Sequence, residues 1–355
     1  MYGQLIDLLD KRKVLDYSRT IGSERYVKSF DAWQHLLVML YAVIKRLDSL
    51  REISASMYPE ANKLAHIGLT SLPRRSTLSD ANARRSEKVF ERVYRDLYQT
   101  YKDELSSDSR KRQNPKWFDK LQIIDSTTIS LFSNLVFKGV GRHPKTGKKK
   151  GGIKAHTIIH ANEGVPSDIK FTSAATNDSF MLQPAQYAKG DIVALDRAYI
   201  DYEKFETLSR NGVTYVTKMK KNLKYTVQKD VMYMNDDGHM EMEAEDIVDI
   251  YRKRWEIELL FKQLKQNFPL RYFYGESANA IKIQIWVTLI ANLLLMVVQK
   301  RVRNRSWSFS GLATIIRITL MYYINCYSFL NNPDKDWEKL IEQSKEPPIQ
   351  LSLFD

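Results

Sequence analysis

The chain has almost no cysteine, which excludes two classes of protein. Cys326 is the only cysteine among 355 residues, so neither a disulfide within the chain nor a cysteine-cluster metal site can form. A lone cysteine fits a reducing, cytoplasmic setting. The N-terminus also lacks the long apolar core and small-residue cleavage site of a secretory signal. We therefore expect a cytoplasmic protein.

Long hydrophobic runs and excess acid are missing as well. The most apolar stretch, residues 281–298, is interrupted by Lys282, Gln284 and Asn292 and barely reaches membrane-spanning length. We interpret it as a buried helix and expect no membrane partner. With 55 Lys plus Arg against 42 Asp plus Glu, the formal charge is +13, which indicates an anionic partner. A composition of 43% apolar residues excludes a disordered chain, and the length suggests two domains or one large one.

The first part of the chain has helical periodicity. Apolar residues recur at helical spacing over 33–47 and 89–101. Between them, Pro73 ends one element, and Ser76 or Thr77 can cap the next. A basic helix after a turn is the layout of a helix-turn-helix DNA reader, although an ordinary bundle with a solvated basic helix fits equally well. We expect an all-α DNA-binding domain over residues 1–110, with DNA contacts from Arg74, Arg75, Arg84 and Arg85.

After a polar linker at 105–115, the pattern changes to strands. Short apolar runs at 121–125, 156–161, 167–172 and 191–196 are bounded by Gly, Pro and Asn. Alternation over 215–242 suggests a β-rich insertion, placed at about 205–245, and helical periodicity returns at 246–267. This order predicts an α/β domain over 116–330 and a polar tail over 331–355.

Two of the predicted strands end in an aspartate, Asp125 and Asp196. Carboxylates fixed at the ends of core strands repel one another unless cations lie between them. Such a pair suits two divalent metal ions, which activate a nucleophile and stabilise a leaving oxygen in phosphoryl transfer. The alternative is that each aspartate caps a turn or helix.

The third element is a helix with four polar residues at 3-, 4- and 7-residue intervals. Tyr251, Arg254, Glu258 and Lys265 fall on one helical face. An apolar stripe beside them, comprising Ile250, Ile257, Phe261, Leu264 and Phe268, would hold the helix on a sheet. Glu258 could then join the two aspartates. The alternative is an amphipathic helix with an ordinary i,i+4 salt bridge.

The four residues at these intervals resemble the Tyr-x2-Arg-x3-Glu-x6-Lys signature of DDE insertion-sequence transposases, in the group numbered four. IIDSTTI, KGGIKAH and LDRAY are similar to that family's first-aspartate strand, basic segment and second-aspartate strand. KSFDAWQHLLVMLYA and STLSDANARR resemble its helical leader. The resemblance covers residues 1 to about 330 in order.

The resemblance implies a ribonuclease H-like mixed sheet flanked by helices, with Asp125, Asp196 and Glu258 as catalytic metal ligands. Two Mg²⁺ ions per site would be the cofactors, and Mn²⁺ could substitute. The enzyme would bind the transposon's terminal inverted repeats as a homodimer in a synaptic complex, cleave the ends by hydrolysis and transesterification through hairpins, and join the 3′ ends to target DNA. Tyr251, Arg254 and Lys265 would contact phosphates, and Trp255 would stack on an extruded base or pack internally.

Two further segments extend the predicted contacts. The glycine- and lysine-rich stretch 138–156 includes Lys148, Lys149, Lys150 and Lys154, which we expect to contact DNA. At the C-terminus, Gln350, Leu351, Leu353 and Phe354 resemble the peptide that docks bacterial proteins on the replicative sliding clamp. The alternative is a terminal strand packed on its own domain. We expect the protein to be associated with the nucleoid in a bacterial cytoplasm.

Two rival functions remain open at this point. One is a structure-selective DNA nuclease with the same fold. The other is a non-catalytic DNA-binding repressor that merely holds transposon ends.

Overall fold

The centre of the molecule is a five-stranded mixed sheet. In the computed structural model the described residues are all except 26, 70, 107–114, 131–151, 175, 220–231, 236–237, 242–243, 304–306 and 333–355. The strand order is β3-β2-β1-β4-β5. The strands are β1 (Leu121–Ser130), β2 (Gly152–His160), β3 (Pro166–Ser173), β4 (Ile192–Leu195) and β5 (Thr214–Thr217).

Strand directions confirm the predicted fold class. β2 is antiparallel to β1 and β3, whereas β4 is parallel to β1 and β5. This order, with one central strand reversed, is the topology of a ribonuclease H-like sheet. Parallel strands need long crossovers, and α8 (Tyr202–Arg210) lies in the crossover from β4 to β5.

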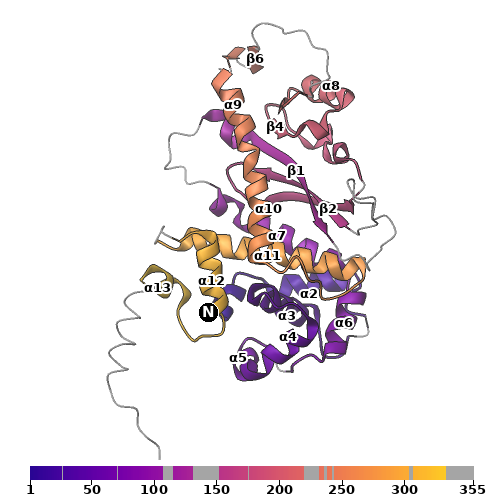
Figure 1. Ribbon diagram of the computed structural model, residues 1–355, viewed down its shortest axis with the longest axis vertical. Coiled ribbons are helices and arrows are strands. Elements are labelled where there is room, and N and C mark those ends of the chain that lie inside the picture. The colour runs from indigo at the N-terminus through magenta and orange to yellow at the C-terminus, as the bar shows by residue number, and fades with distance from the viewer. Residues whose placement is uncertain are drawn as a thin grey trace, which may run out of the picture.

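The two faces of the sheet are packed against different helices. Side chains alternate along β1, so that Ile123 belongs to the large hydrophobic core and Ile124 to a smaller one. The smaller core contains Phe205 and Leu208 of α8. On the opposite face lie α9 (Ala244–Lys253) and α10 (Trp255–Asn267), which run along the sheet toward a layer of helices (Figure 1).

That helical layer is built from both ends of the chain. Its N-terminal members are α1 (Tyr2–Ile6), α2 (Lys11–Thr20), α3 (Ala32–Lys45), α4 (Leu50–Met57), α5 (Ala61–His66), α6 (Arg75–Arg84) and α7 (Glu87–Leu105). The C-terminal members are α11 (Ala278–Arg301), α12 (Phe309–Thr319) and α13 (Cys326–Asn331), and α11 packs on α3 and α7. The Tyr2 amide donates to the Leu320 carbonyl at 2.8 Å. Residues 278–331 therefore complete the helical layer, and packing crosses the domain boundary predicted near residue 110.

Helix α11 has the length and composition of a membrane span, but it is a core helix. It is the one helix in the described part of the chain that passes this test, and 89% of its apolar window is buried inside the protein. Gln284 donates to the carbonyls of Pro269 and Tyr272, which satisfies its amide inside the fold. The predicted buried helix at 281–298 is confirmed.

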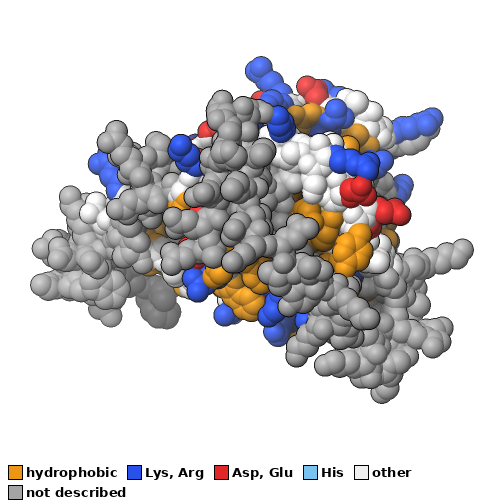
Figure 2. Space-filling view, turned by 90° about the horizontal axis from the view of Figure 1, so that it is seen from above, with side chains coloured by type: hydrophobic (Ala, Val, Ile, Leu, Met, Phe, Trp, Pro, Cys, Tyr) orange, Lys and Arg blue, Asp and Glu red, His pale blue; other side chains and the backbone are white. Residues whose placement is uncertain are grey.

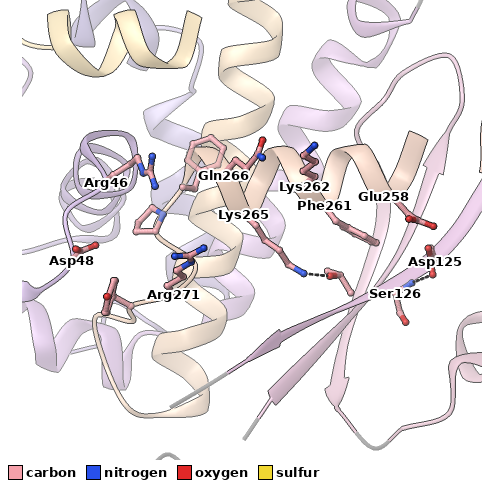
Figure 3. A pocket seen from close by; sticks show the side chains of 14 residues that line it. Arg46, Asp48, Asp125, Ser126, Glu258, Phe261, Lys262, Lys265, Gln266 and Arg271 are labelled. Carbon is pink, nitrogen blue, oxygen red and sulfur yellow. Dashed lines mark hydrogen bonds between the residues drawn. The ribbon is translucent and has the colours of Figure 1, made fainter. Parts of the chain in front are cut away.

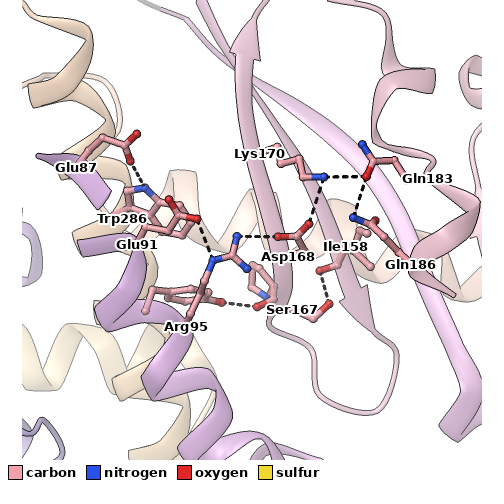
Figure 4. Close-up of polar contacts among 12 residues, drawn as sticks. Glu87, Glu91, Arg95, Ile158, Ser167, Asp168, Lys170, Gln183, Gln186 and Trp286 are labelled. Carbon is pink, nitrogen blue, oxygen red and sulfur yellow. Dashed lines mark hydrogen bonds and ion pairs between the residues drawn. The ribbon is translucent and has the colours of Figure 1, made fainter. Parts of the chain in front are cut away.

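Polar contacts fix the helical layer to the sheet (Figure 4). Arg95 of α7 donates to Asp168 of β3 at 2.9 Å and to Glu91 at the same distance. The Trp286 indole of α11 donates to Glu87 at 2.9 Å. Because α7 is bound to both the sheet edge and α11, it fixes the position of the helical layer relative to the sheet.

One local expectation was wrong. Helix α6 begins after Arg74, which makes no side-chain cap, so neither Ser76 nor Thr77 caps it. The insertion placed at about 205–245 stays a prediction; within that range β5 pairs with β4 in the five-stranded sheet, and α8 precedes it. Within the described residues, the hairpin of β6 (Met232–Asn235) and β7 (Gly238–Glu241) is the β-structure outside that sheet.

Candidate active site

The signature helix is broken at its central arginine. α9 ends at Lys253, α10 begins at Trp255, and the Arg254 amide donates three residues back to Tyr251 at 3.2 Å. This tight turn is where the helix passes the sheet. The apolar stripe predicted beside the signature is confirmed as buried: Ile250, Ile257, Phe261, Leu264 and Phe268 all belong to the core. Burial of these side chains holds α10 against β1.

Arg254 joins two of the predicted catalytic acids. Its Nη1 donates to Asp125 Oδ2 at 3.2 Å, and its Nη2 donates to Glu258 Oε1 at 2.8 Å. The residue is only 9% exposed. The i,i+4 salt bridge considered from the sequence is therefore present, but the same guanidinium also reaches across to the sheet. The bond to Glu258 has the short length typical of a charge-assisted hydrogen bond, and the bond to Asp125 is longer.

Asp125 lies within β1, not at its end. The strand continues to Ser130 because it pairs with β2 over its whole length. Asp125 has the same parity as Ile123, which places it on the face that α10 covers. Figure 3 shows its carboxylate beside that of Glu258.

Asp196 is brought beside Asp125 by strand register. Ile124 of β1 is opposite Leu195 of the parallel β4. One residue further on, Asp125 and Asp196 follow on neighbouring strands about 4.8 Å apart. Asp196 also accepts from the Ala198 amide at 3.0 Å, so the capping alternative holds for this residue in addition.

Burial sets the electrostatics of the site. It raises the pKa of Asp125 to about 6. The Ser126 amide and Arg254 act against this rise, whereas the charges of Asp196 and Glu258 add to it. An acid in this environment is costly to ionise unless positive charge is nearby.

The remaining signature residues lie around the acids. Lys265 Nζ donates to Thr127 Oγ1 at 2.7 Å, two residues beyond Asp125 on the same face of β1. The Arg254 guanidinium carbon lies 5.7 Å from the centre of the Tyr251 ring, within cation–π range. The structure thus brings Tyr251, Arg254, Glu258 and Lys265 to one site.

A second polar network, which no sequence motif predicts, lies on the opposite face of β1. Asp178 accepts from Ser126 Oγ at 2.6 Å and from Lys154 Nζ at 3.2 Å. Lys154 also donates to the Thr176 carbonyl at 2.9 Å. The lysine expected to contact DNA is thus engaged within the protein and supports the strand that carries Asp125.

A cleft of about 890 Å³ runs from the acids to the helical layer (Figure 3). Asp125 and Glu258 line one end, and Arg46 and Asp48, which follow α3, line the other. Its basic residues are Arg46, Lys262, Lys265 and Arg271. Arg46, Lys262 and Arg271 were not identified from the sequence, because none of them is a position of the signature.

The four arginines near α6 have different environments. Arg74 and Arg75 are exposed, and Arg84 is exposed and pairs with Asp80. Arg85 is 4% exposed and donates to the Phe30 carbonyl at 2.9 Å. Arg85 corrects the sequence interpretation, since a buried side chain that binds the backbone is unavailable to DNA.

Trp255 lies outside the acid cluster. It is 56% exposed and lines a separate groove of about 460 Å³ with Trp117, Phe118 and Leu259. Seen from above, the molecule has hydrophobic and basic side chains next to one another on its surface (Figure 2). Lys148, Lys149, Lys150 and the 350–354 motif lie outside the described residues.

The family profile described as "Transposase DDE domain" matches residues 116–294, just over half of the chain. The chain belongs to this transposase family. Residues 1–70 match a domain of unknown function, DUF4372. The transposase domain thus extends from the start of the sheet region into α11, and it includes Asp125, Asp196 and Glu258.

Curated relatives agree with the DDE transposase assignment. The putative transposase for insertion sequence element IS4SA of Synechocystis sp. is 26% identical over 62% of this chain and 70% of its own. The putative transposase y4zB of Sinorhizobium fredii is 25% identical over 63% of this chain and 71% of its own.

The solved piggyBac transposase synaptic complex with hairpin DNA aligns with 98% of this chain and 80% of its own, at a TM-score of 0.42 and 10% identity. Assignment to the group numbered four stays a prediction.

The acids of this DDE transposase fit a divalent metal cofactor in their chemistry. Carboxylate oxygens are the ligands that hard divalent cations prefer. As the described side chains are placed, no three acids or histidines are gathered closely enough to hold a metal ion. Positive charge is instead supplied to Asp125 and Glu258 by the Arg254 guanidinium.

Proposed function

We propose that this transposase cleaves the ends of its own insertion sequence by metal-dependent phosphodiester chemistry and joins the freed 3′ ends to target DNA. The observation that carries the proposal is that Arg254 joins Asp125 and Glu258 at one end of a basic cleft, with Asp196 following the strand next to Asp125. A repressor that only holds DNA would have no need of a buried acid with a raised pKa, bonded to an arginine that also binds a second acid.

The three acids would hold Mg²⁺, two ions per site. When bound, the metal supplies an activated water and stabilisation of the leaving oxygen. Mn²⁺ could replace Mg²⁺, because both accept carboxylate oxygens. The protein's own part is to fix the acids: β1 carries Asp125, the register with β4 sets Asp196, and core packing of α10 sets Glu258.

Arg254, Tyr251 and Lys265 would orient the scissile strand. Arg254 is shared between two carboxylates, so a phosphate entering the site would compete for a guanidinium that is already in position. Lys265 faces the cleft from the next turns of α10. Hairpin formation at the ends is part of the proposal by family resemblance. Trp255 lies in a different groove, where an extruded base could stack on it.

The wider assembly is proposed on the same basis. The enzyme would act on terminal inverted repeats as a homodimer within a synaptic complex in a bacterial cytoplasm. Arg74, Arg75 and Arg84 are exposed on or beside α6, which suits contact with the DNA backbone, and Lys148–Lys150 would add to it. The 350–354 motif would dock on the sliding clamp.

The central experiment uses DNA duplexes that end in the repeats flanking the gene. The wild-type protein with Mg²⁺ should release a 3′ end, and a denaturing gel should distinguish a nick from a hairpin. Pre-cut ends should also join a target plasmid. Glu258→Gln should abolish both reactions and retain DNA binding, since it removes one proposed ligand but keeps the helix.

The matched control is Glu206→Gln on α8, where the carboxylate pairs with Arg210 at 2.6 Å and lines neither the cleft nor the Trp255 groove. It should cleave and join like the wild type. Cleavage without strand transfer would favour the nuclease alternative. Binding of the ends with no Mg²⁺-dependent or Mn²⁺-dependent cleavage would favour the repressor and refute the proposed activity.

Clamp docking has its own test. Deletion of residues 349–355 should abolish binding to the purified sliding clamp and leave end cleavage unchanged. Unchanged clamp binding by the shortened chain would rule out the motif.

A further inference from the structure

Arg46 has a backbone conformation that arginine rarely adopts. Its φ of 59° and ψ of 42° are left-handed, and it is the one non-glycine residue of positive φ within the described segments. It closes α3 in a hydrogen-bonded cap: the Arg46 amide donates to Val43 at 3.2 Å, and the Leu47 amide donates to Ala42 at 3.0 Å. Glycine is usual at this position because it has no Cβ to clash with the backbone.

The positive charge of a neighbouring arginine also disfavours arginine at position 46. Arg317 of α12 donates to the Ile44 carbonyl and to the Asn267 carbonyl, each at 3.2 Å. It therefore ties together the C-terminal ends of α3 and α10 beside Arg46. Burial lowers the pKa of Arg317, and the positive charge of Arg46 lowers it further. Two cations lie close together at a place where glycine would satisfy the backbone.

The Arg46 side chain lines the cleft that begins at the catalytic acids. Between them lie Lys262 on α10 and Arg271 in the segment between α10 and α11, and Figure 3 shows this order along the cleft. None of the three basic residues forms an ion pair with a described residue. Asp48 is the acid at this end of the cleft, so the distal half carries three positive charges against one negative charge.

We propose that Arg46, Lys262 and Arg271 form a backbone track that holds the phosphates of the DNA leading away from the scissile bond. The inference rests on the proposed function and adds to it: the helical layer supplies a DNA contact within the active cleft. The left-handed backbone of Arg46 and the repulsion from Arg317 both cost free energy. An anion bound to Arg46 offsets that cost. A polyanion fits better than a small ion because the three cations are spread along the cleft.

The test measures DNA binding in EDTA, so that cleavage does not interfere. Fluorescence anisotropy of a labelled repeat-end duplex is recorded over a series of salt concentrations, and each variant is also melted. Arg46→Gly should lower the slope of log affinity against log salt by about 1, the share of one phosphate contact. Its melting temperature should be unchanged or higher, because glycine relieves the left-handed strain.

Companion variants separate charge from shape. Arg46→Lys keeps the charge and should keep the wild-type slope, and Arg271→Ala should lower it like Arg46→Gly. Arg210→Ala on α8 is the control: it removes an exposed arginine, paired with Glu206, that does not line the cleft. Its slope should match the wild type.

The outcomes distinguish the track from the proposed function. If the wild-type protein binds the duplex and the salt slopes of Arg46→Gly and Arg271→Ala equal the wild-type slope, the track is overturned and the transposase proposal still stands. Failure of the wild-type protein to bind the duplex at all would overturn both. An equal loss in Arg210→Ala would also overturn the track, because the effect would then follow net charge.

Discussion

Replacing Asp125 by asparagine should make the metal-free protein more stable while it removes activity. Burial raises the pKa of this carboxyl to about 6, against about 4 for an exposed aspartate. The folded state therefore holds the proton more tightly than the unfolded chain. Stability from this group is fully present below about pH 4 and is lost as the pH rises through about 6.

The magnitude follows from the two pKa values. At about pH 7.5 the charged carboxylate destabilises the fold by about 2.7 kcal/mol, and at about pH 5 by about 1.4 kcal/mol. Asparagine has one acceptor oxygen where aspartate accepts from both Ser126 and Arg254, so the substitution loses about 1 kcal/mol of hydrogen bonding. The net gain should be about 1.7 kcal/mol at about pH 7.5 and about 0.4 kcal/mol at about pH 5.

The assay is urea unfolding in EDTA at both pH values. Taking wild type minus variant cancels the titration of the other carboxylates, so the stability difference should grow by about 1.3 kcal/mol between about pH 5 and pH 7.5. A matched Asp249→Asn variant, at an exposed i,i+3 pair with Arg252, should show no such growth. If Asp125→Asn is less stable than the wild type at the higher pH, burial does not dominate this site and the reasoning is wrong.

Three further predictions concern the supporting structure. Arg254→Lys keeps the charge but replaces the two Nη donors of the planar guanidinium by a single nitrogen, so the two carboxylates lose their fixed spacing and end cleavage should be lost while DNA binding remains. Trp286→Phe removes the indole bond to Glu87 inside the layer and should cost about 2 kcal/mol in urea unfolding. Burial lowers the pKa of His35 to about 3, so acidification from about pH 7 to pH 5 should cost about 2 kcal/mol that His35→Gln does not lose.

Each of these has an outcome that contradicts it. Wild-type cleavage by Arg254→Lys would show that charge alone suffices at that position. Trp255→Phe, an exposed control, should change stability by less than about 0.5 kcal/mol. If it costs as much as Trp286→Phe, the loss at Trp286 cannot be assigned to its buried indole bond. An unchanged acid response in His35→Gln would mean that His35 titrates normally.

Periodicity and spacing predicted several features without the structure. The apolar runs predicted the core strands, and the interrupted apolar stretch predicted a buried α11, which is confirmed. The 3-, 4- and 7-residue intervals placed Arg254, Glu258 and Lys265 on one helical face. These features depend on the periodicity of helices and strands, which can be read from the spacing of residues in the sequence. The end of β1 was missed because pairing with β2 extends the strand beyond the hydrophobic run.

Long-range packing decided the rest. The sequence determined which acids and bases the chain carries and on which faces of its helices and strands they lie. Only the tertiary structure decided that Arg254 reaches Asp125, 129 residues away, that Arg85 is buried, and that Arg46 of the helical layer lines the same cleft as Asp125 and Glu258. The physical reason is that burial and charge pairing depend on which surfaces meet, and residues far apart in the chain meet only once the two layers pack together.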